Sequence, residues 1–190
     1  MSEIYYFMAS VSKEEQVLML ILENSPLKHW HFEEIVKQAK VTRAVANKWL
    51  KKYQEEGLIR KIKEKQRFPY FTAGSNNLVY QSRKRQYGID SLYQSGLISH
   101  LLGLKDAKTV IVFGSIARGD WYKDSDIDIF IFGNAEGIDK YTYEIKLQKG
   151  IELHVFPSRE DIKEVRSGLI KNVVNGHIVK GGIEDFAEVS

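Results

Sequence analysis

The sequence predicts an α+β protein with two modules joined by a helical linker, for three reasons. Apolar residues recur at helical spacing through the first half of the chain. The second half instead contains short apolar runs typical of strands. Charge divides the chain in the same way: residues 1–74 carry 13 Lys and Arg against 9 Asp and Glu, and residues 106–190 carry 11 against 15. A basic front suits a polyanion and an acidic back suits cations. We therefore expect domains at residues 1–74 and 105–190, with the linker over residues 75–104.

Composition narrows the functional classes. With 43% apolar and 28% charged residues, the 190-residue chain resembles folded globular proteins and not disordered ones. It contains no cysteine, which excludes a disulfide framework and a thiolate zinc site. No apolar run approaches the roughly 20 residues of a membrane span. The first residues also lack the basic start and long apolar stretch of a signal peptide. These features predict a cytoplasmic protein without membrane contact.

Three helices are predicted in the front module, over residues 13–23, 32–40 and 43–56. Ser12 precedes the first helix and Glu15 follows three residues later, which is the spacing of a capping box. Thr42 is expected to cap the third helix, and Gly57 to close it. Helical spacing predicts that the buried face of the third helix contains Val45, Trp49, Leu50 and Tyr53.

A basic hairpin is predicted after these helices, with strands at Leu58–Lys65 and Phe68–Thr72 and a turn near Gln66. Three helices followed by a basic hairpin resemble a winged helix-turn-helix domain. The resemblance implies DNA binding through the outward residues of the third helix, which are Arg43, Asn47, Lys48, Lys51 and Lys52. It also implies phosphate contacts from the hairpin, through Lys61, Lys63, Lys65 and Arg67. The alternative is a solvated basic surface on a domain that makes only protein contacts.

The linker over residues 75–104 is predicted to be helical. Gly88 and Gly96 are its candidate breaks. Winged-helix regulators often dimerise through helices at this place in the chain, and by that analogy we expect a homodimer.

Strands are prominent in the back module. Apolar runs predict three of them, at Thr109–Phe113, Asp126–Phe132 and Ile151–Phe156. Helical spacing predicts a helix over residues 160–175. Residues 139–147 are expected to form a short helix, although their alternating pattern also fits a strand. The segment His-Ile-Val-Lys-Gly-Gly near the end is a candidate for one more short strand.

The strongest chemical signal is a pair of aspartates at the start of the second strand. Asp126 and Asp128 are two residues apart, so their side chains point to the same face of the strand. Burying two unpaired carboxylates is costly, whereas Mg²⁺ prefers such oxygen ligands together with phosphate oxygens. Glu152, on the third strand, is expected to lie beside them as a further ligand and as a base toward a hydroxyl. His154, on the same face as Glu152, is expected to contact substrate or to be structural.

A glycine-containing turn precedes these aspartates. Gly114 and Ser115 directly follow a buried strand, and a glycine at this point lets backbone amides approach a triphosphate closely. Arg118 adds a planar positive group for phosphate, and Gly119 adds a second flexible point.

The combined pattern, Val-Phe-Gly-Ser and then Ser-Asp-Ile-Asp-Ile, contains the signature GSxARGDxxxxSDIDI without departure. Over residues 105–182 it resembles the DNA polymerase β-like nucleotidyltransferase superfamily, in its minimal nucleotidyltransferase form. The resemblance implies a small mixed sheet flanked by helices. It implies transfer of a nucleoside monophosphate from an NTP to an acceptor hydroxyl, with two Mg²⁺ ions held by Asp126, Asp128 and Glu152. It further implies nucleotide contacts from Gly114, Ser115, Arg118 and Ser125.

Three functions are compatible with these patterns. The first is an active nucleotidyltransferase coupled to a DNA-binding domain, with a protein among its candidate acceptors. The second is a nucleotide-sensing transcriptional regulator or antitoxin-like protein, in which the back domain mainly binds a partner such as a toxin and transfers little or nothing. The third is modification of a small molecule such as an aminoglycoside, for which no dedicated acceptor pocket is predicted. A structural calcium site or a capped strand end is the remaining explanation of the aspartate pair.

Overall fold

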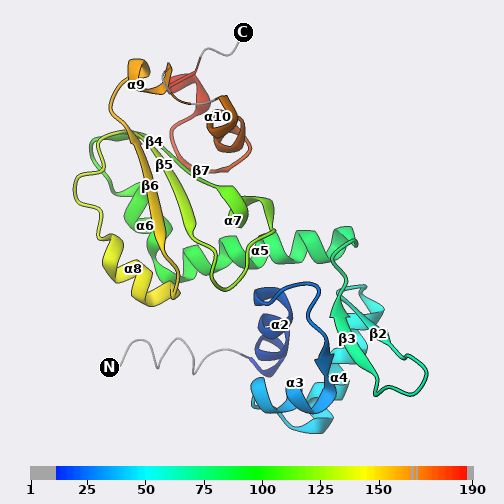
Figure 1. The fold of residues 1–190 in the computed structure, drawn as a ribbon. Helices are drawn as coiled ribbons and strands as arrows, with labels where there is room; N and C mark the ends of the chain where they lie inside the picture. The colour runs from blue at the N-terminus through cyan, green and yellow to red at the C-terminus, as the bar shows by residue number, and fades with distance from the viewer. Residues whose placement is uncertain (1–11, 164, 166, 188–190) are drawn as a thin grey trace. The chain divides into compact units, whose positions relative to one another are not determined.

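The computed structural model describes residues 12–163, 165 and 167–187. The chain forms two compact units, Met1–Lys84 and Arg85–Ser190, and each contains helices and one small sheet (Figure 1). The protein is therefore of the mixed α+β class. Within the described ranges, no helix combines the length and the apolar character needed to cross a membrane.

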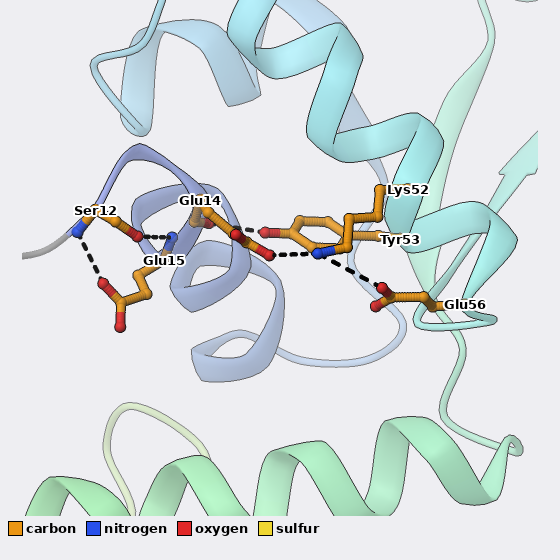
Figure 2. Close-up of polar contacts among 6 residues, drawn as sticks. All are labelled: Ser12, Glu14, Glu15, Lys52, Tyr53 and Glu56. Atoms are coloured by element: carbon orange, nitrogen blue, oxygen red, sulfur yellow. Dashed lines mark hydrogen bonds and ion pairs between the residues drawn. The ribbon is translucent and has the colours of Figure 1, made fainter.

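Capping side chains define the starts of two helices in the first unit. In chain order, its described part contains α2 (Lys13–Glu23), β1 (Trp30–His31), α3 (Phe32–Gln38), α4 (Arg43–Glu55), β2 (Ile59–Ile62), β3 (Tyr70–Ala73) and the start of α5 (Leu78–Ser95). The Ser12 hydroxyl accepts a hydrogen bond from the Glu15 N–H at 3.1 Å, and the Glu15 carboxylate accepts one from the Ser12 N–H at 2.8 Å (Figure 2). The predicted capping box is confirmed, and Thr42 caps α4 by accepting from the Val45 N–H.

The sheet of the first unit contains a strand that was not predicted. The strand order of this sheet is β1-β3-β2, and both pairs are antiparallel. The strand that was not predicted is β1, whose two residues are too few to show an alternating pattern. The hairpin strands are shorter than predicted, since β2 ends at Ile62 and β3 begins at Tyr70. Between them Gln66 turns the chain with a φ of 64°. Helix α3 also stops early, at Gln38, and Lys40 just beyond it has a φ of 51°.

Polar side chains connect α2 with α4. The Tyr53 hydroxyl donates to the Glu14 carbonyl oxygen at 2.8 Å (Figure 2). Lys52 Nζ lies 3.0 Å from a carboxylate oxygen of Glu14 and 3.7 Å from one of Glu56. Burial, reinforced by the negative charge of Glu14, raises the pKa of the Tyr53 hydroxyl above its usual range. Tyr53 and Lys52 therefore hold the start of α2 against the end of α4.

The buried face of α4 differs from the prediction. Ala46, Leu50 and Tyr53 are its buried residues, whereas the predicted Val45 and Trp49 are only half buried. Ala46 has 0% exposure, but its small side chain contributes little to a hydrophobic pattern. The prediction therefore followed the larger side chains of the neighbouring residues.

The segment predicted as a linker contains α5 and α6 (Leu97–Leu102), and only one of its two candidate breaks interrupts it. Gly96, with a φ of 85°, separates the two helices. Helix α5 continues through Gly88. A Cβ atom at Gly88 would lie 2.7 Å from Nε1 of the buried Trp121, so this glycine makes room for the indole instead of ending the helix.

The second unit is built on a four-stranded mixed sheet. After α6 its described part contains β4 (Ala107–Phe113), α7 (Gly114–Arg118), β5 (Ile127–Gly133), α8 (Lys140–Leu147), β6 (Ile151–Phe156), α9 (Arg159–Lys163), α10 (Ser167–Val174), β7 (His177–Lys180) and η1 (Ile183–Asp185). The strand order is β6-β5-β4-β7 (Figure 1). Strands β5 and β6 are parallel, and β4 is antiparallel to both β5 and β7. The three strands predicted from apolar runs and the short final strand are all present.

Both faces of the central strands β4 and β5 are buried, which explains their continuous apolar runs. On one face Ile111, Phe113, Phe130 and Phe132 pack with side chains from α9, α10 and η1. On the other face the intervening residues are completely buried as well, namely Val110, Val112, Ile129 and Ile131. In the register of β4 and β5, Phe113 pairs with Asp128, which places this acidic residue at the end of the two buried strands.

The prediction of a single helix over residues 160–175 is wrong. The chain forms α9 and α10 instead. The Val165 N–H donates to the Ile162 carbonyl oxygen at 3.1 Å, a tighter turn than an α-helical one. Ser167 and Gly168, at the start of α10, are poor formers of a helix interior. Two short helices thus replace one long helix while Ile162 and Val173 still reach the core.

Candidate active site

The parallel pairing of β5 and β6 brings acidic side chains together. Asp128 lies directly beside Glu152 in the register, and Phe130 lies beside His154. Because side chains two apart on a strand share a face, Asp128, Glu152 and His154 point to the same side of the sheet. One ligand atom from each of these three residues lies within 4.8 Å of the others. This group is the candidate metal centre of the described residues.

A glycine at the end of β4 leaves space for the Asp128 carboxylate. Phe113, the last residue of β4, pairs with Asp128. Gly114 then adopts a φ of 72°, a conformation that L side chains rarely adopt. A Cβ atom on Gly114 would overlap a carboxylate oxygen of Asp128. The chain therefore turns from β4 into α7 in direct contact with this carboxylate.

Asp126 lies just before β5 and is exposed. The Ile127 N–H donates to the Gly150 carbonyl oxygen at 2.8 Å, which extends the pairing of β5 and β6 by one step. A Cβ atom on Gly150 would overlap the Asp126 carboxylate. Asp126 is not among the three residues whose ligand atoms lie within 4.8 Å of each other. The structure thus brings Asp128 and Glu152 together, and it places Asp126 at the same end of the two strands.

Electrostatics at the site favour binding of a cation. Burial raises the pKa of the Asp128 carboxyl; Glu152 and Asp126 raise it further, and only His154 acts in the opposite direction. The Asp128 side chain is 24% exposed, whereas that of Glu152 is 61% exposed. A cation beside Asp128 would compensate for its lost hydration and for its negatively charged neighbours.

His154 belongs to this group, although the sequence pattern left its role open. Its Nε2 atom lies 3.7 Å from Asp128 Oδ1 and 3.7 Å from Glu152 Oε1. The atom is buried and has no hydrogen-bond partner among the described residues. Its ring packs against Phe113 with 5.1 Å between the ring centres. The available signal was its position two residues after Glu152, on the same strand face.

The residues predicted to contact the nucleotide lie in α7 and in the turn before β5. Gly114 and Ser115 form the first residues of α7, next to Asp128. Arg118 is at the last turn of α7, where its Nε donates to Asp120 at 3.1 Å. The Ser125 hydroxyl accepts a hydrogen bond from the Tyr122 N–H at 2.8 Å and closes a turn before β5.

Lys149, which lies between α8 and β6, anchors that turn, and this role was not predicted. Lys149 Nζ donates to the carbonyl oxygens of Tyr122 at 2.6 Å and Lys123 at 2.7 Å. The same ammonium group lies 5.1 Å from the centre of the Trp121 ring, and this ring stacks on Tyr87 at 6.0 Å. The segment that leads to Asp126 is therefore held from both sides.

The predicted DNA-binding residues of the first unit differ in their contacts. Ion pairs with glutamates engage four of them: Arg43, Lys51, Lys52 and Arg67. Another five make no ion pair in the part of the chain that the structure describes: Asn47, Lys48, Lys61, Lys63 and Lys65. All five of these are exposed.

Comparisons with known proteins place the site in a wider context. Residues 98–180 match a family model described as nucleotidyltransferase domain. A protein of Methanocaldococcus jannaschii named "putative protein adenylyltransferase" is 35% identical over 72 residues, which cover 35% of this chain and 71% of that relative. No solved structure matches the chain significantly.

Proposed function

This chain belongs to the nucleotidyltransferase domain family, and from that premise we propose that its second unit transfers a nucleoside monophosphate from an NTP to an acceptor hydroxyl with Mg²⁺ as cofactor. One observation carries the proposal. Asp128 and Glu152 stand side by side on paired strands, directly against the glycine that begins α7. Acidic ligands beside a glycine turn are the elements that a metal-bound triphosphate needs.

The residues of the site fit a divalent cation. Asp126, Asp128 and Glu152 would hold it, and two ions are expected by resemblance to the superfamily. The buried position of the Asp128 carboxyl among like charges supports this assignment, because a bound cation favours the ionised form. When bound, Mg²⁺ supplies neutralisation of the triphosphate charge and a lower pKa for the acceptor hydroxyl.

The protein groups then orient the triphosphate and move one proton. Ser115 and the Gly114 amide hold the terminal phosphates, with Arg118 and Ser125 as further contacts. The acceptor oxygen forms a bond to the α-phosphorus, and the bond from this phosphorus to the bridging oxygen breaks. Pyrophosphate leaves with that oxygen. Glu152, the more exposed carboxylate, takes the proton of the acceptor hydroxyl.

The name of the Methanocaldococcus jannaschii relative suggests one class of donor and one class of acceptor. That protein is named for adenylyl transfer to protein. We therefore propose ATP as the donor and a protein hydroxyl as the acceptor in this chain. A toxin partner and a homodimer stay predictions.

Transfer of label from ATP tests this function. The chain is incubated with α-phosphate-labelled ATP, Mg²⁺ and candidate acceptor proteins. Asp128→Asn is expected to lower the rate by more than the roughly 10- to 100-fold that loss of a supporting residue costs a metal site. Asp124→Asn, which changes an exposed acid four residues earlier, is the matched control and should keep full activity. Equal rates for the two variants would remove Asp128 from the mechanism.

We further propose that the first unit binds DNA through α4 and the hairpin. The exposed Lys63 and Lys65 have no acidic partner in the described part of the chain, so phosphates would be their counterions. Replacing both lysines with alanine should make the negative slope of log affinity against log salt shallower by about 1.8, because each phosphate contact contributes about 0.9. Lys163→Ala/Lys171→Ala, which removes two exposed charges from the second unit, is the control. Fluorescence anisotropy at several salt concentrations measures the slope, and a slope that both double variants change equally would refute the assignment.

A further inference from the structure

The metal centre contains a nitrogen atom whose contacts are unusual for a structural histidine. His154 Nε2 lies 3.7 Å from a carboxylate oxygen of Asp128 and equally far from one of Glu152. Nitrogen–oxygen hydrogen bonds are about 2.7–3.2 Å long, so neither contact is a hydrogen bond. Ligands bound at about 2.0–2.2 Å to one ion are roughly 3–4 Å apart, and both nitrogen–oxygen distances of His154 fall in that interval.

The nitrogen is also buried without a partner. Nε2 of His154 is shielded from solvent, and no hydrogen bond reaches it from any residue that the structure describes. A buried polar atom normally has a partner, because leaving it unsatisfied costs free energy. The two nearest charged groups are the Asp128 and Glu152 carboxylates, and at 3.7 Å both lie beyond hydrogen-bond distance of this nitrogen. A cation between the three groups would satisfy all of them at once.

The orientation of the imidazole is fixed by its surroundings. His154 lies in the parallel pair beside Phe130, which has 0% exposure. The ring packs against Phe113 at 5.1 Å between ring centres. The backbone register thus sets the position of the side chain, and an aromatic neighbour limits its rotation. A ligand held in this way loses little conformational freedom when it coordinates an ion.

We propose that His154 coordinates the divalent cation together with Asp128 and Glu152, and that this nitrogen ligand makes the centre prefer Mn²⁺ to Mg²⁺. The inference rests on the proposed function in one respect only, namely that the cation occupies this group. Oxygen ligands suit both ions. First-row transition ions accept imidazole nitrogen more readily than Mg²⁺ does, and among them Mn²⁺ is the ion that also suits oxygen ligands. The number of nitrogen ligands therefore decides the preference.

Direct spectroscopy of the unmodified protein provides the first test. The full chain is loaded with one equivalent of Mn²⁺, and electron spin echo measurements record coupling between the ion and nearby nitrogen nuclei. We expect coupling from a directly bound histidine nitrogen, and a changed coupling pattern when histidine is labelled with nitrogen-15. Absence of this coupling in protein that has bound Mn²⁺ would overturn the proposal.

Two variants then test the preference. His154→Phe preserves an aromatic ring against Phe113 and removes the nitrogen. His177→Phe, in β7 of the same sheet, is the matched control, because His177 bonds to the Tyr93 hydroxyl at 3.0 Å and lies outside the metal group. Calorimetric titration is expected to show that His154→Phe weakens Mn²⁺ binding by about 10-fold or more and Mg²⁺ binding much less. The control should leave both affinities unchanged.

Other outcomes are also decisive. Equal weakening of Mn²⁺ and Mg²⁺ in His154→Phe would refute the preference for Mn²⁺, and absence of nitrogen coupling would refute coordination by His154. If nitrogen coupling is present but no nucleotidyl transfer occurs with either ion, the metal centre stands and the proposed function fails. If nucleotidyl transfer occurs but nitrogen coupling is absent, the proposed function stands and coordination by His154 fails.

Discussion

Alanine at Gly114 tests whether the turn from β4 into α7 is built around the Asp128 carboxylate. The added Cβ would overlap that carboxylate, and the residue would keep a φ of 72°. Gly137 offers a matched control. Its φ is 86°, and a Cβ there would meet nothing within 4 Å. The two substitutions therefore share the backbone cost, and only Gly114→Ala adds the overlap.

The magnitudes follow from these two contributions. A left-handed conformation costs a residue with a Cβ about 1–2 kcal/mol. Overlap in a packed site adds about 1–3 kcal/mol. We expect Gly114→Ala to lower the free energy of unfolding of the second unit by about 2–5 kcal/mol. Gly137→Ala should lower it by about 1–2 kcal/mol. In an Asp128→Ala background the cost at Gly114 should fall to the level of the control, whereas Asp128→Asn should retain the overlap.

Fluorine NMR of fluorotryptophan-labelled protein in urea measures these differences. The chain has 3 tryptophans, and Trp121 is the one in the second unit. Its resonance therefore follows the unfolding of that unit separately from the first. Equal losses for Gly114→Ala and Gly137→Ala would refute the reasoning, as would a cost at Gly114 that is the same with and without the Asp128 carboxylate.

Three further predictions concern packing, loop anchoring and pH. Gly88→Ala should lower the stability of the second unit by about 1–3 kcal/mol, because the new Cβ would lie 2.7 Å from Trp121. Thermal unfolding measures this change. Alanine within a helix usually raises the melting temperature, and such a rise would contradict the prediction. Lys149→Met removes two hydrogen bonds to backbone oxygens and should speed amide exchange in the turn before β5, so unchanged exchange there would count against the anchoring role. Tyr53 has a raised pKa in the folded state, so the unfolded chain loses this proton first and the free energy of unfolding should fall as the pH rises above about 10. Tyr53→Phe should show a smaller fall between pH 9 and 11, and identical falls would exclude Tyr53 as the source.

The predicted elements with strong local signals are the ones found in the structure. The first helix has the predicted limits because Ser12 and Glu15 form a complete capping box. The strand Ile151–Phe156 also has its predicted limits, because Pro157 directly follows it and cannot donate a ladder hydrogen bond. The proximity of Asp128 and Glu152 could be predicted because both precede apolar strand residues.

Features that depend on tertiary contacts could not be predicted from the sequence. The role of Gly88 is set by Trp121, which is 33 residues further along the chain. The strand β1 exists only because β3 lies beside it. The place of His154 in the metal group depends also on the packing of its ring against Phe113 in β4, which no local pattern contains.

The strand that carries Glu152 and His154 lies at an edge of the sheet. Within the described residues β6 pairs only with β5, whereas β4 and β5 are flanked on both sides. An edge strand can separate from its neighbour in a local opening that leaves the rest of the core intact. Such an opening would take Glu152 and His154 away from Asp128 while the second unit remained folded. The proposed metal centre would therefore come apart in this local opening, and a bound ion that bridges β5 and β6 would favour the closed edge.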